Sequence, residues 1–192
     1  MSVSIKINGR CLSAEPGQTI LEVARSHGIE IPTLCDYPGL PSHGSCRMCV
    51  VEIQGWPNTP TACTTPVADG MVVKTESEYL RSLRSDLLRM LLAEHPGACL
   101  FCPENQNCEE CMITLRKAGV TTGCRSCPSD GACTLQDLVK QYGLNSVAYP
   151  VRYRALAVEK EDPFFDRDYN LCVLCGRCIR VCESLHFTHI PT

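Results

Sequence analysis

The sequence has few aromatic residues, no long apolar run and no excess of basic charge. Only 6% of its 192 residues are aromatic, which limits how large a packed core it can form. No apolar run approaches the roughly 20 residues that cross a bilayer, so we expect no direct membrane contact. A net charge of −3 gives no basic footprint, which argues against a nucleic-acid partner.

Familiar catalytic and nucleotide-binding motifs are also missing. The chain has no G-x-G-x-x-G turn, no Walker loop and no serine nucleophile elbow. Its first residues, MSVSIKINGR, contain no apolar segment of the kind that a secretory signal needs. We therefore expect a protein of the reducing cytoplasm that has no active site of its own.

Cysteine, in contrast, is abundant and occupies 16 positions. In a reducing compartment, thiols at short fixed spacings are more often metal ligands than disulfide partners. The cysteines fall into three blocks, which predict an α+β chain of three domains, at residues 1–76, 77–148 and 149–192.

The first block has the pattern of a small sheet with one helix. The segment VSIKING alternates like a strand and contains an Asn8-Gly9 hairpin turn, after which the alternation resumes at residues 11–14. Thr19 is a candidate N-cap for a helix that ends near Gly28. Further strands are predicted over residues 49–54 and 71–75. This order predicts a β-grasp, the fold of [2Fe-2S] ferredoxins.

Four cysteines of this block have a ligand-like spacing, Cys35-x10-Cys46-x2-Cys49-x13-Cys63. A [2Fe-2S] cluster needs four thiolates, and backbone N–H groups close to the sulfurs tune its potential. We expect Gly44 to allow that close approach. The alternative is that these are four unrelated buried cysteines. Cys11, on a predicted strand outside the loop, is interpreted as a small core residue.

The segment IPTLCDYPGLPSHGSCRMCVVEI, followed by TACTTPVADGMVVKT, resembles a known domain. It is similar to the N-terminal [2Fe-2S] domain of the large iron-sulfur subunit of bacterial complex I, the NADH dehydrogenase. The same domain occurs in iron-only hydrogenases and in the iron-sulfur subunits of NAD-linked hydrogenases and formate dehydrogenases. Ten residues separate the first two ligands, Cys35 and Cys46, as in this family, whereas plant-type ferredoxins have four residues between the first two ligands.

The second block begins with leucines at helical spacing, which predict a helix over roughly residues 78–94. Its predicted core residues are Leu80, Leu83, Leu87, Leu88 and Leu91. The chain then continues as His95-x3-Cys99-x2-Cys102-x5-Cys108, which is similar to the family's histidine-ligated [4Fe-4S] motif. This resemblance implies that His95 is an iron ligand.

The C-x2-C-x5-C spacing occurs a second time, as Cys124-x2-Cys127-x5-Cys133, before a predicted short helix, TLQDLVKQYG. The resemblance implies a single such triplet before the short helix, so residues 99 to about 123 resemble an insertion that carries four extra cysteines. With Cys111 included, residues 95–133 contain one histidine and seven cysteines. These eight candidate ligands are enough for two sites.

Two partitions fit these eight ligands. In the local partition, one [4Fe-4S] cluster uses His95, Cys99, Cys102 and Cys108, and the other uses Cys111, Cys124, Cys127 and Cys133. In the nested partition, His95 joins Cys124, Cys127 and Cys133, and the inserted cysteines hold a metal of their own. We favour the local partition because it keeps the family's spacing from histidine to cysteine. Zinc in one of these sites is an alternative, since paired C-x2-C knuckles also bind zinc.

The third block is Cys172-x2-Cys175-x2-Cys178-x3-Cys182, the spacing of a bacterial [4Fe-4S] ferredoxin. Gly176 permits a tight turn around a cluster. In two-cluster ferredoxins the fourth cysteine of this run binds the other cluster, so Cys182 needs a partner motif downstream. Because only ten residues follow, we expect residues 149–192 to be the first half of such a domain, from a longer polypeptide or a natural truncation.

Together the blocks predict one [2Fe-2S] cluster and two or three [4Fe-4S] clusters. Fully ligated clusters leave no open iron for a substrate, which favours electron transfer. The resemblance implies a relay subunit that connects a flavin subunit oxidising NAD(P)H to another redox centre, of the hydrogenase, formate or quinone-linked type. A free polyferredoxin and a zinc-rich interaction module are the alternatives.

Overall fold

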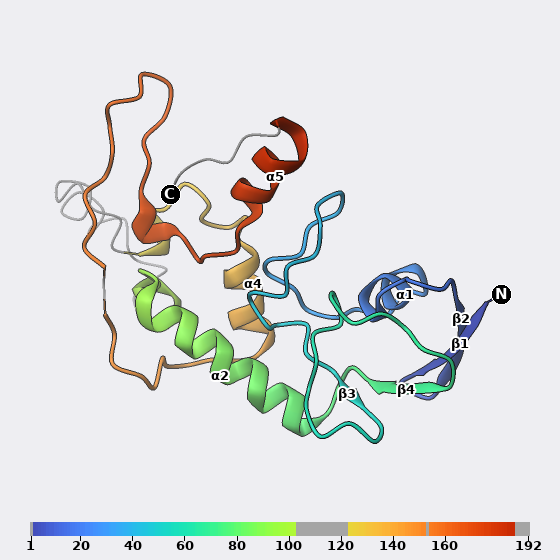
Figure 1. The fold of residues 1–192 in the computed structure, drawn as a ribbon. Coiled ribbons are helices and arrows are strands. Elements are labelled where there is room, and N and C mark those ends of the chain that lie inside the picture. Colours follow the sequence, from blue (N-terminus) through green and yellow to red (C-terminus); the bar gives the residue numbers. More distant parts are fainter. Residues whose placement is uncertain (1, 103–122, 153, 187–192) are drawn as a thin grey trace. The chain divides into compact units, whose positions relative to one another are not determined.

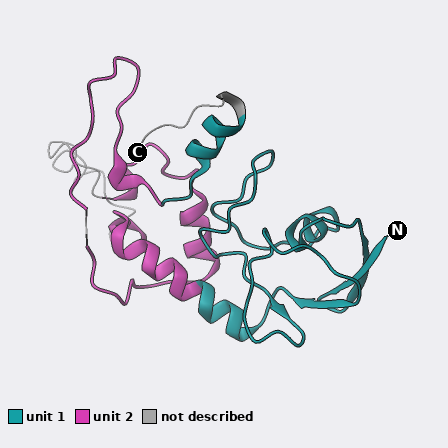
Figure 2. Cartoon of the chain, in the orientation of Figure 1, with its two compact units in different colours: residues 1–84, 174–192 teal, residues 85–173 magenta. Residues whose placement is uncertain are grey.

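The computed structural model describes residues 2–102, 123–152 and 154–186, and Figure 1 shows their helices and strands. The chain forms two compact units (Figure 2). The first unit contains residues 1–84 and 174–192, and the second contains residues 85–173. The division falls inside helix α2 (Glu78–Glu94) and inside the last cysteine motif. The domain boundaries expected from the sequence remain predictions.

The first unit contains the predicted small sheet. Its strands β1 (Val3–Ile7), β2 (Arg10–Ala14), β3 (Glu52–Ile53) and β4 (Met71–Lys74) have the order β2-β1-β4-β3. Strands β1 and β4 are parallel, and the other two pairs are antiparallel. Asn8 and Gly9 both have positive φ, of 49° and 84°, as a tight hairpin turn between β1 and β2 requires.

Strand β3 is shorter than the predicted strand over residues 49–54. Val50 and Val51 precede it and pair elsewhere: Val50 forms a bridge with Thr61, and the Val51 N–H donates to the Pro60 carbonyl at 3.0 Å. These two valines therefore join the segment that leads to Cys63, and only Glu52 and Ile53 pair with β4.

Helix α1 (Ile20–Ser26) packs on this sheet. Thr19 caps it as predicted, in a capping box: Thr19 Oγ1 accepts from the Glu22 N–H, and a Glu22 carboxylate oxygen accepts from the Thr19 N–H at 2.7 Å. The apolar face of the helix belongs to one core cluster with buried residues of β1, β2 and β4. This core holds the loops that carry the first group of cysteines.

The interpretation of Cys11 as a core residue is wrong, because Cys11 is exposed. Its neighbour in the strand, Leu12, is buried and pairs with Ile5, while Cys11 pairs with Lys6. Successive side chains of a strand point to opposite faces of the sheet, so Cys11 lies on the face away from the core.

Helix α2 has the predicted bounds, but its buried residues differ from those predicted. Leu80 and Leu88 are fully buried, as expected, whereas Leu83, Leu87 and Leu91 are only half-buried. The buried positions recur every four residues and include a charged residue, Arg84, which is 0% exposed. The Arg84 guanidinium donates to the carbonyls of Val50 and Thr75 at 2.7 and 2.9 Å.

The remaining elements are short. The second unit contains the 3-10 turns η1 (Ala98–Phe101), η3 (Cys124–Ser126) and η4 (Tyr169–Leu171), and helix α4 (Thr134–Gln141). Helix α5 (Arg177–His186) belongs to the first unit. Across the described residues, every helix is too short or too polar to span a bilayer.

Candidate metal centres

The four cysteines of the first block come together as two pairs of thiols. The Cys35 N–H donates to the Cys46 sulfur at 3.3 Å, and the two thiols are hydrogen-bonded to each other. Cys49 and Cys63 form the second thiol pair, and the Ala62 N–H donates to the Cys49 carbonyl at 2.9 Å. Cys35, Cys49 and Cys63 are almost fully buried, and Cys46 is half-buried.

Each pair contains one thiol that ionises more easily than a free cysteine. A hydrogen bond from the Cys46 thiol lowers the pKa of Cys35, and a hydrogen bond from the Cys63 thiol lowers the pKa of Cys49. The same hydrogen bonds, together with burial, raise the pKa of Cys46 and of Cys63. Because metal binds the thiolate form, one cysteine of each pair is already favoured in its binding form before the cluster is present.

Two pairs of thiols fit a two-iron cluster. A [2Fe-2S] cluster takes four thiolates, two on each iron, so its ligands approach two by two. The paired arrangement therefore favours a [2Fe-2S] cluster over one mononuclear ion.

Gly44 lies in the loop before Cys46, with a φ of 70°. A Cβ at this position would lie 3.2 Å from Thr64 Cγ2 and 3.3 Å from Thr61 Oγ1. The absent side chain thus leaves room for the two threonines on either side of Cys63. The expectation that Gly44 brings N–H groups to sulfur remains a prediction.

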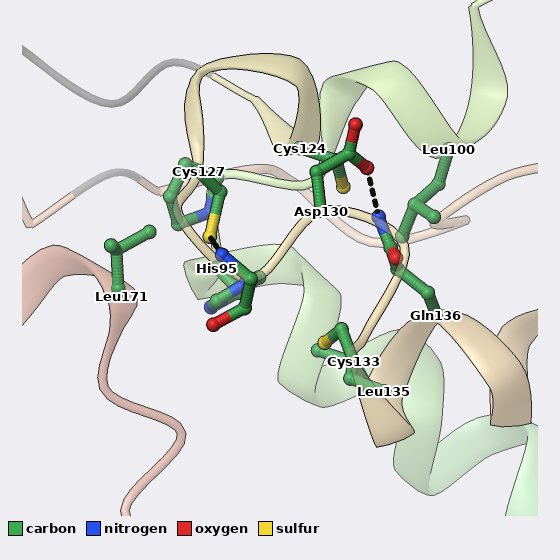
Figure 3. Close-up of a pocket in the computed structure, with 11 residues that line it drawn as sticks. His95, Leu100, Cys124, Cys127, Asp130, Cys133, Leu135, Gln136 and Leu171 are labelled. Atoms are coloured by element: carbon green, nitrogen blue, oxygen red, sulfur yellow. Dashed lines mark hydrogen bonds between the residues drawn. The ribbon is translucent and has the colours of Figure 1, made fainter.

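In the second unit, His95 and the second C-x2-C-x5-C triplet line one pocket (Figure 3). His95 follows the end of helix α2, Cys124 begins the η3 turn, and Cys133 precedes helix α4. These elements bring His95, Cys124, Cys127 and Cys133 to the same pocket. The Gln136 amide donates to Asp130 at 2.8 Å on the pocket wall, and the Gly131 N–H donates to Gln136 Oε1 at 3.0 Å.

The surroundings of His95 favour its neutral, ligating form. Burial is the main cause that lowers the pKa of His95, and the positive charge of Arg154 lowers it further. Within the described residues, its buried Nδ1 atom has no hydrogen-bond partner. A neutral imidazole with a buried, unpaired nitrogen fits a metal ligand. Arg154 itself was not identified from the sequence, because it lies in a polar stretch with no motif.

Cys124 is buried, and burial raises the pKa of its thiol. A hydrogen bond from Gln136 opposes this shift, whereas the negative charges of Cys99, Asp130 and Cys133 add to it. The surroundings of Cys124 therefore favour its protonated form when no cation is present.

The first C-x2-C segment lies beside the second, and its Leu100 lines the His95 pocket, but its two cysteines, Cys99 and Cys102, do not. Both segments form the same turn, in which the Cys102 N–H donates to the Cys99 carbonyl at 3.4 Å and the Cys127 N–H donates to the Cys124 carbonyl at 2.9 Å. Turns η1 and η3 contact each other, and a Cβ at Gly123 would clash with the Cys99 sulfur. Cys102 is exposed. Cys108 and Cys111 lie outside the described residues.

The third motif spans the division between the units, with Cys172 in the second unit and Cys175, Cys178 and Cys182 in the first. Leu174 and Gly176 have positive φ values, of 54° and 64°, so the backbone turns sharply on both sides of Cys175. Cys178 and Cys182 are on helix α5, one turn apart. The ligand roles of these four cysteines remain predictions.

The fold and the paired thiols define a ferredoxin-type iron-sulfur protein, and residues 1–78 match the family described as a 2Fe-2S iron-sulfur cluster binding domain. The chain is 36% identical over 95% of its length to a subunit of an NADH-quinone oxidoreductase of Rhizobium meliloti, and covers 19% of that protein. It is 32% identical to a subunit of the NADP-reducing hydrogenase of Solidesulfovibrio fructosivorans, with 95% of this chain and 28% of the relative covered.

A solved NAD+-reducing [NiFe]-hydrogenase has a similar structure, with a TM-score of 0.78 and 30% identity. The similarity covers 97% of this chain and 68% of that one. The chain therefore belongs to the family of iron-sulfur subunits of NADH dehydrogenases and NAD(P)-linked hydrogenases, as the sequence motifs indicated. It spans only 19% and 28% of the length of these two curated relatives.

Proposed function

We propose that the chain is a multi-cluster electron relay in a cytoplasmic oxidoreductase complex and has no active site of its own. The observation that carries this proposal is the arrangement of Cys35, Cys46, Cys49 and Cys63 as two buried thiol pairs in a 2Fe-2S binding domain. A bound iron-sulfur cluster supplies reversible one-electron transfer. The protein supplies the thiolates, the apolar surroundings and the hydrogen bonds that set the potential.

The second centre is a [4Fe-4S] cluster bound by His95, Cys124, Cys127 and Cys133, which is the nested partition. The pocket that these four residues line supports this assignment over the local partition, because Cys99 and Cys102 are not part of that pocket. The unpaired Nδ1 of His95 also supports it. A neutral imidazole in place of a thiolate makes the cluster less negative, so we expect a higher reduction potential.

Two further sites complete the relay. One is a third cluster, or a structural zinc, on Cys99, Cys102, Cys108 and Cys111, for which the spacing is the support. The other is a [4Fe-4S] cluster on Cys172, Cys175, Cys178 and Cys182, in a domain of which residues 149–192 form the first half.

The partners are a flavin subunit that oxidises NAD(P)H and a further redox subunit, of the hydrogenase, formate or quinone-linked type. The names of the relatives support this role, since they are subunits of an NADH-quinone oxidoreductase and of an NADP-reducing hydrogenase. We propose no nucleic-acid partner and no direct contact with a membrane.

Metal content is the first test of the relay. The protein is purified anaerobically with its native partners, and iron, acid-labile sulfide and zinc are counted per chain. One [2Fe-2S] and three [4Fe-4S] clusters require about 14 iron atoms, whereas a structural zinc in one middle site gives about 10 iron and one zinc. Loss of NAD(P)H-to-acceptor turnover in Cys46→Ser is expected, and full turnover in that variant would reject the relay. A colourless, zinc-containing protein would favour the interaction module.

The partition of the middle ligands has a separate test. A histidine-ligated cluster carries a nitrogen hyperfine coupling that is seen by pulsed electron paramagnetic resonance (EPR) on protein labelled with 15N-histidine. We expect Cys124→Ser to abolish this coupled signal and Cys99→Ser to leave it intact. The reverse result would restore the local partition. Size-exclusion chromatography of native extract distinguishes a complex subunit from a small, freely diffusing polyferredoxin.

A further inference from the structure

Arg180, on helix α5, contacts the loop that carries the first [2Fe-2S] ligand, and both belong to the same compact unit. Its side chain is almost completely buried, since the residue is only 7% exposed. The guanidinium donates hydrogen bonds to the main-chain carbonyls of Cys35 and Pro41. It also donates to the carbonyls of Gly176 and Cys175, each at 3.3 Å. Arg180 thus joins the Cys35 loop to the turn around Cys175.

The charge of Arg180 has no partner among the described side chains. Arginine remains protonated when buried, and its desolvation is costly unless a negative charge compensates it. Its four carbonyl acceptors satisfy N–H groups but carry no net charge. No described carboxylate forms an ion pair with Arg180, and the nearby Asp36 is paired with Arg25 at 2.6 Å.

A [2Fe-2S] cluster on four thiolates is an anion. The Cys35 sulfur would bind this cluster, and the carbonyl of the same residue accepts a hydrogen bond from Arg180. We infer that Arg180 is a positioning residue whose fixed positive charge balances the [2Fe-2S] site and raises its reduction potential. Reduction adds a negative charge to the cluster, so a nearby cation stabilises the reduced form more than the oxidised form. This inference rests on the [2Fe-2S] domain and needs neither the proposed [4Fe-4S] sites nor the proposed partners.

Arg177 attaches helix α5 to the same loop independently of Arg180. The charge of Arg180 can therefore be removed while the helix stays docked. Arg177 lies one turn before Arg180, donates to the Asp36 carbonyl at 3.1 Å and stacks over the Tyr37 ring at 5.3 Å. These contacts hold α5 on the same loop when Arg180 is replaced. The loss of the Arg180 charge therefore need not release the helix.

The test is a redox titration of the full chain, purified anaerobically, with the EPR signal of the reduced [2Fe-2S] cluster as the readout. Three variants are compared with the wild type: Arg180→Gln removes the charge, Arg180→Lys keeps it, and Arg10→Gln removes one exposed charge from strand β2. We expect Arg180→Gln to make reduction about tenfold less favourable, a shift of about 59 mV to lower potential for one electron. Arg180→Lys and Arg10→Gln are expected to remain close to the wild type.

An unchanged potential in Arg180→Gln, or equal shifts in Arg180→Gln and Arg180→Lys, would overturn the inference. If Arg180→Gln loses the [2Fe-2S] cluster, measured as iron and labile sulfide, while Arg180→Lys retains it, the charge is needed for assembly and the inference holds. If both variants lose the cluster equally, Arg180 acts by packing and the inference is wrong. In either case the other clusters can still be counted, so the relay proposal is judged separately.

Discussion

Arg84, on helix α2, donates a hydrogen bond of 2.7 Å from Nη2 to the main-chain carbonyl of Val50, which directly follows Cys49 in the sequence. The same guanidinium reaches the Thr75 carbonyl at 2.9 Å and pairs with Glu76 at 2.9 Å. A residue of the long helix is thus tied to the segment that carries Cys49, a proposed [2Fe-2S] ligand.

Replacing this arginine tests its contribution to stability. Arg84→Met leaves the carbonyls of Val50 and Thr75 buried without their donor, and we expect it to lower the free energy of unfolding by about 2–4 kcal/mol. Arg89→Met is the matched control on the same helix, because Arg89 is partly exposed and pairs with Asp86 at 3.0 Å. Its expected cost is below about 1 kcal/mol. Urea denaturation, monitored by circular dichroism, measures the free energy of unfolding of both variants. Equal losses in the two would contradict the role of Arg84.

Cys46 and Cys11 form a matched pair for the first metal centre. Cys46→Ser replaces a thiol that contacts Cys35, and we expect loss or strong alteration of the [2Fe-2S] signal and a loss of about two iron atoms per chain. Cys11→Ser makes the same chemical change at an exposed position on the outer face of the sheet. It should leave iron content and the EPR spectrum unchanged. Iron loss in Cys11→Ser would mean that Cys11 is a ligand.

The surroundings of His95 predict a pH dependence. Burial and Arg154 lower the pKa of His95 below its ordinary value near 6.5, so the folded state favours neutral imidazole. The unfolded chain then binds the proton first as pH falls, and the stability linked to His95 is lost as pH falls from about 6.5 towards the lowered value.

Removing the charge of Arg154 should weaken this effect. Arg154→Gln is expected to raise the pKa of His95, so that acid releases the proposed histidine-ligated cluster at a higher pH than in the wild type, while Arg154→Lys keeps the wild-type midpoint. The measurement is the loss of the nitrogen-coupled EPR signal as a function of pH. Identical midpoints for all three proteins would show that the Arg154 charge does not act on His95.

The capping box of helix α1 gives a smaller, local prediction. Thr19→Ala removes the acceptor for the Glu22 N–H and should cost about 1 kcal/mol of unfolding free energy. Ser13→Ala, at an exposed position of strand β2, should cost less than about 0.5 kcal/mol. Thermal unfolding of the two variants provides the comparison, and an equal effect would mean that the cap does not stabilise the helix.

The sequence by itself indicated the small sheet with its helix α1 in residues 1–76, and it singled out the cysteines and the histidine that are candidate ligands. The Asn8-Gly9 turn, the Thr19 cap and the bounds of helix α2 follow from short-range rules, because turn geometry, capping and helical periodicity act between residues close in sequence. The spacing of Cys35, Cys46, Cys49 and Cys63 likewise indicated a [2Fe-2S] domain, which the family match supports.

Only the tertiary structure decided which distant groups meet. Two identical C-x2-C-x5-C spacings cannot reveal which of them shares a pocket with His95, because that depends on tertiary packing and not on spacing. The burial of Arg84 and Arg180 could not be predicted from the sequence either. A charged side chain is buried only where carbonyls or an anion, distant in sequence, interact with it. Strand pairing, rather than composition, placed Cys11 on the outer face of the sheet.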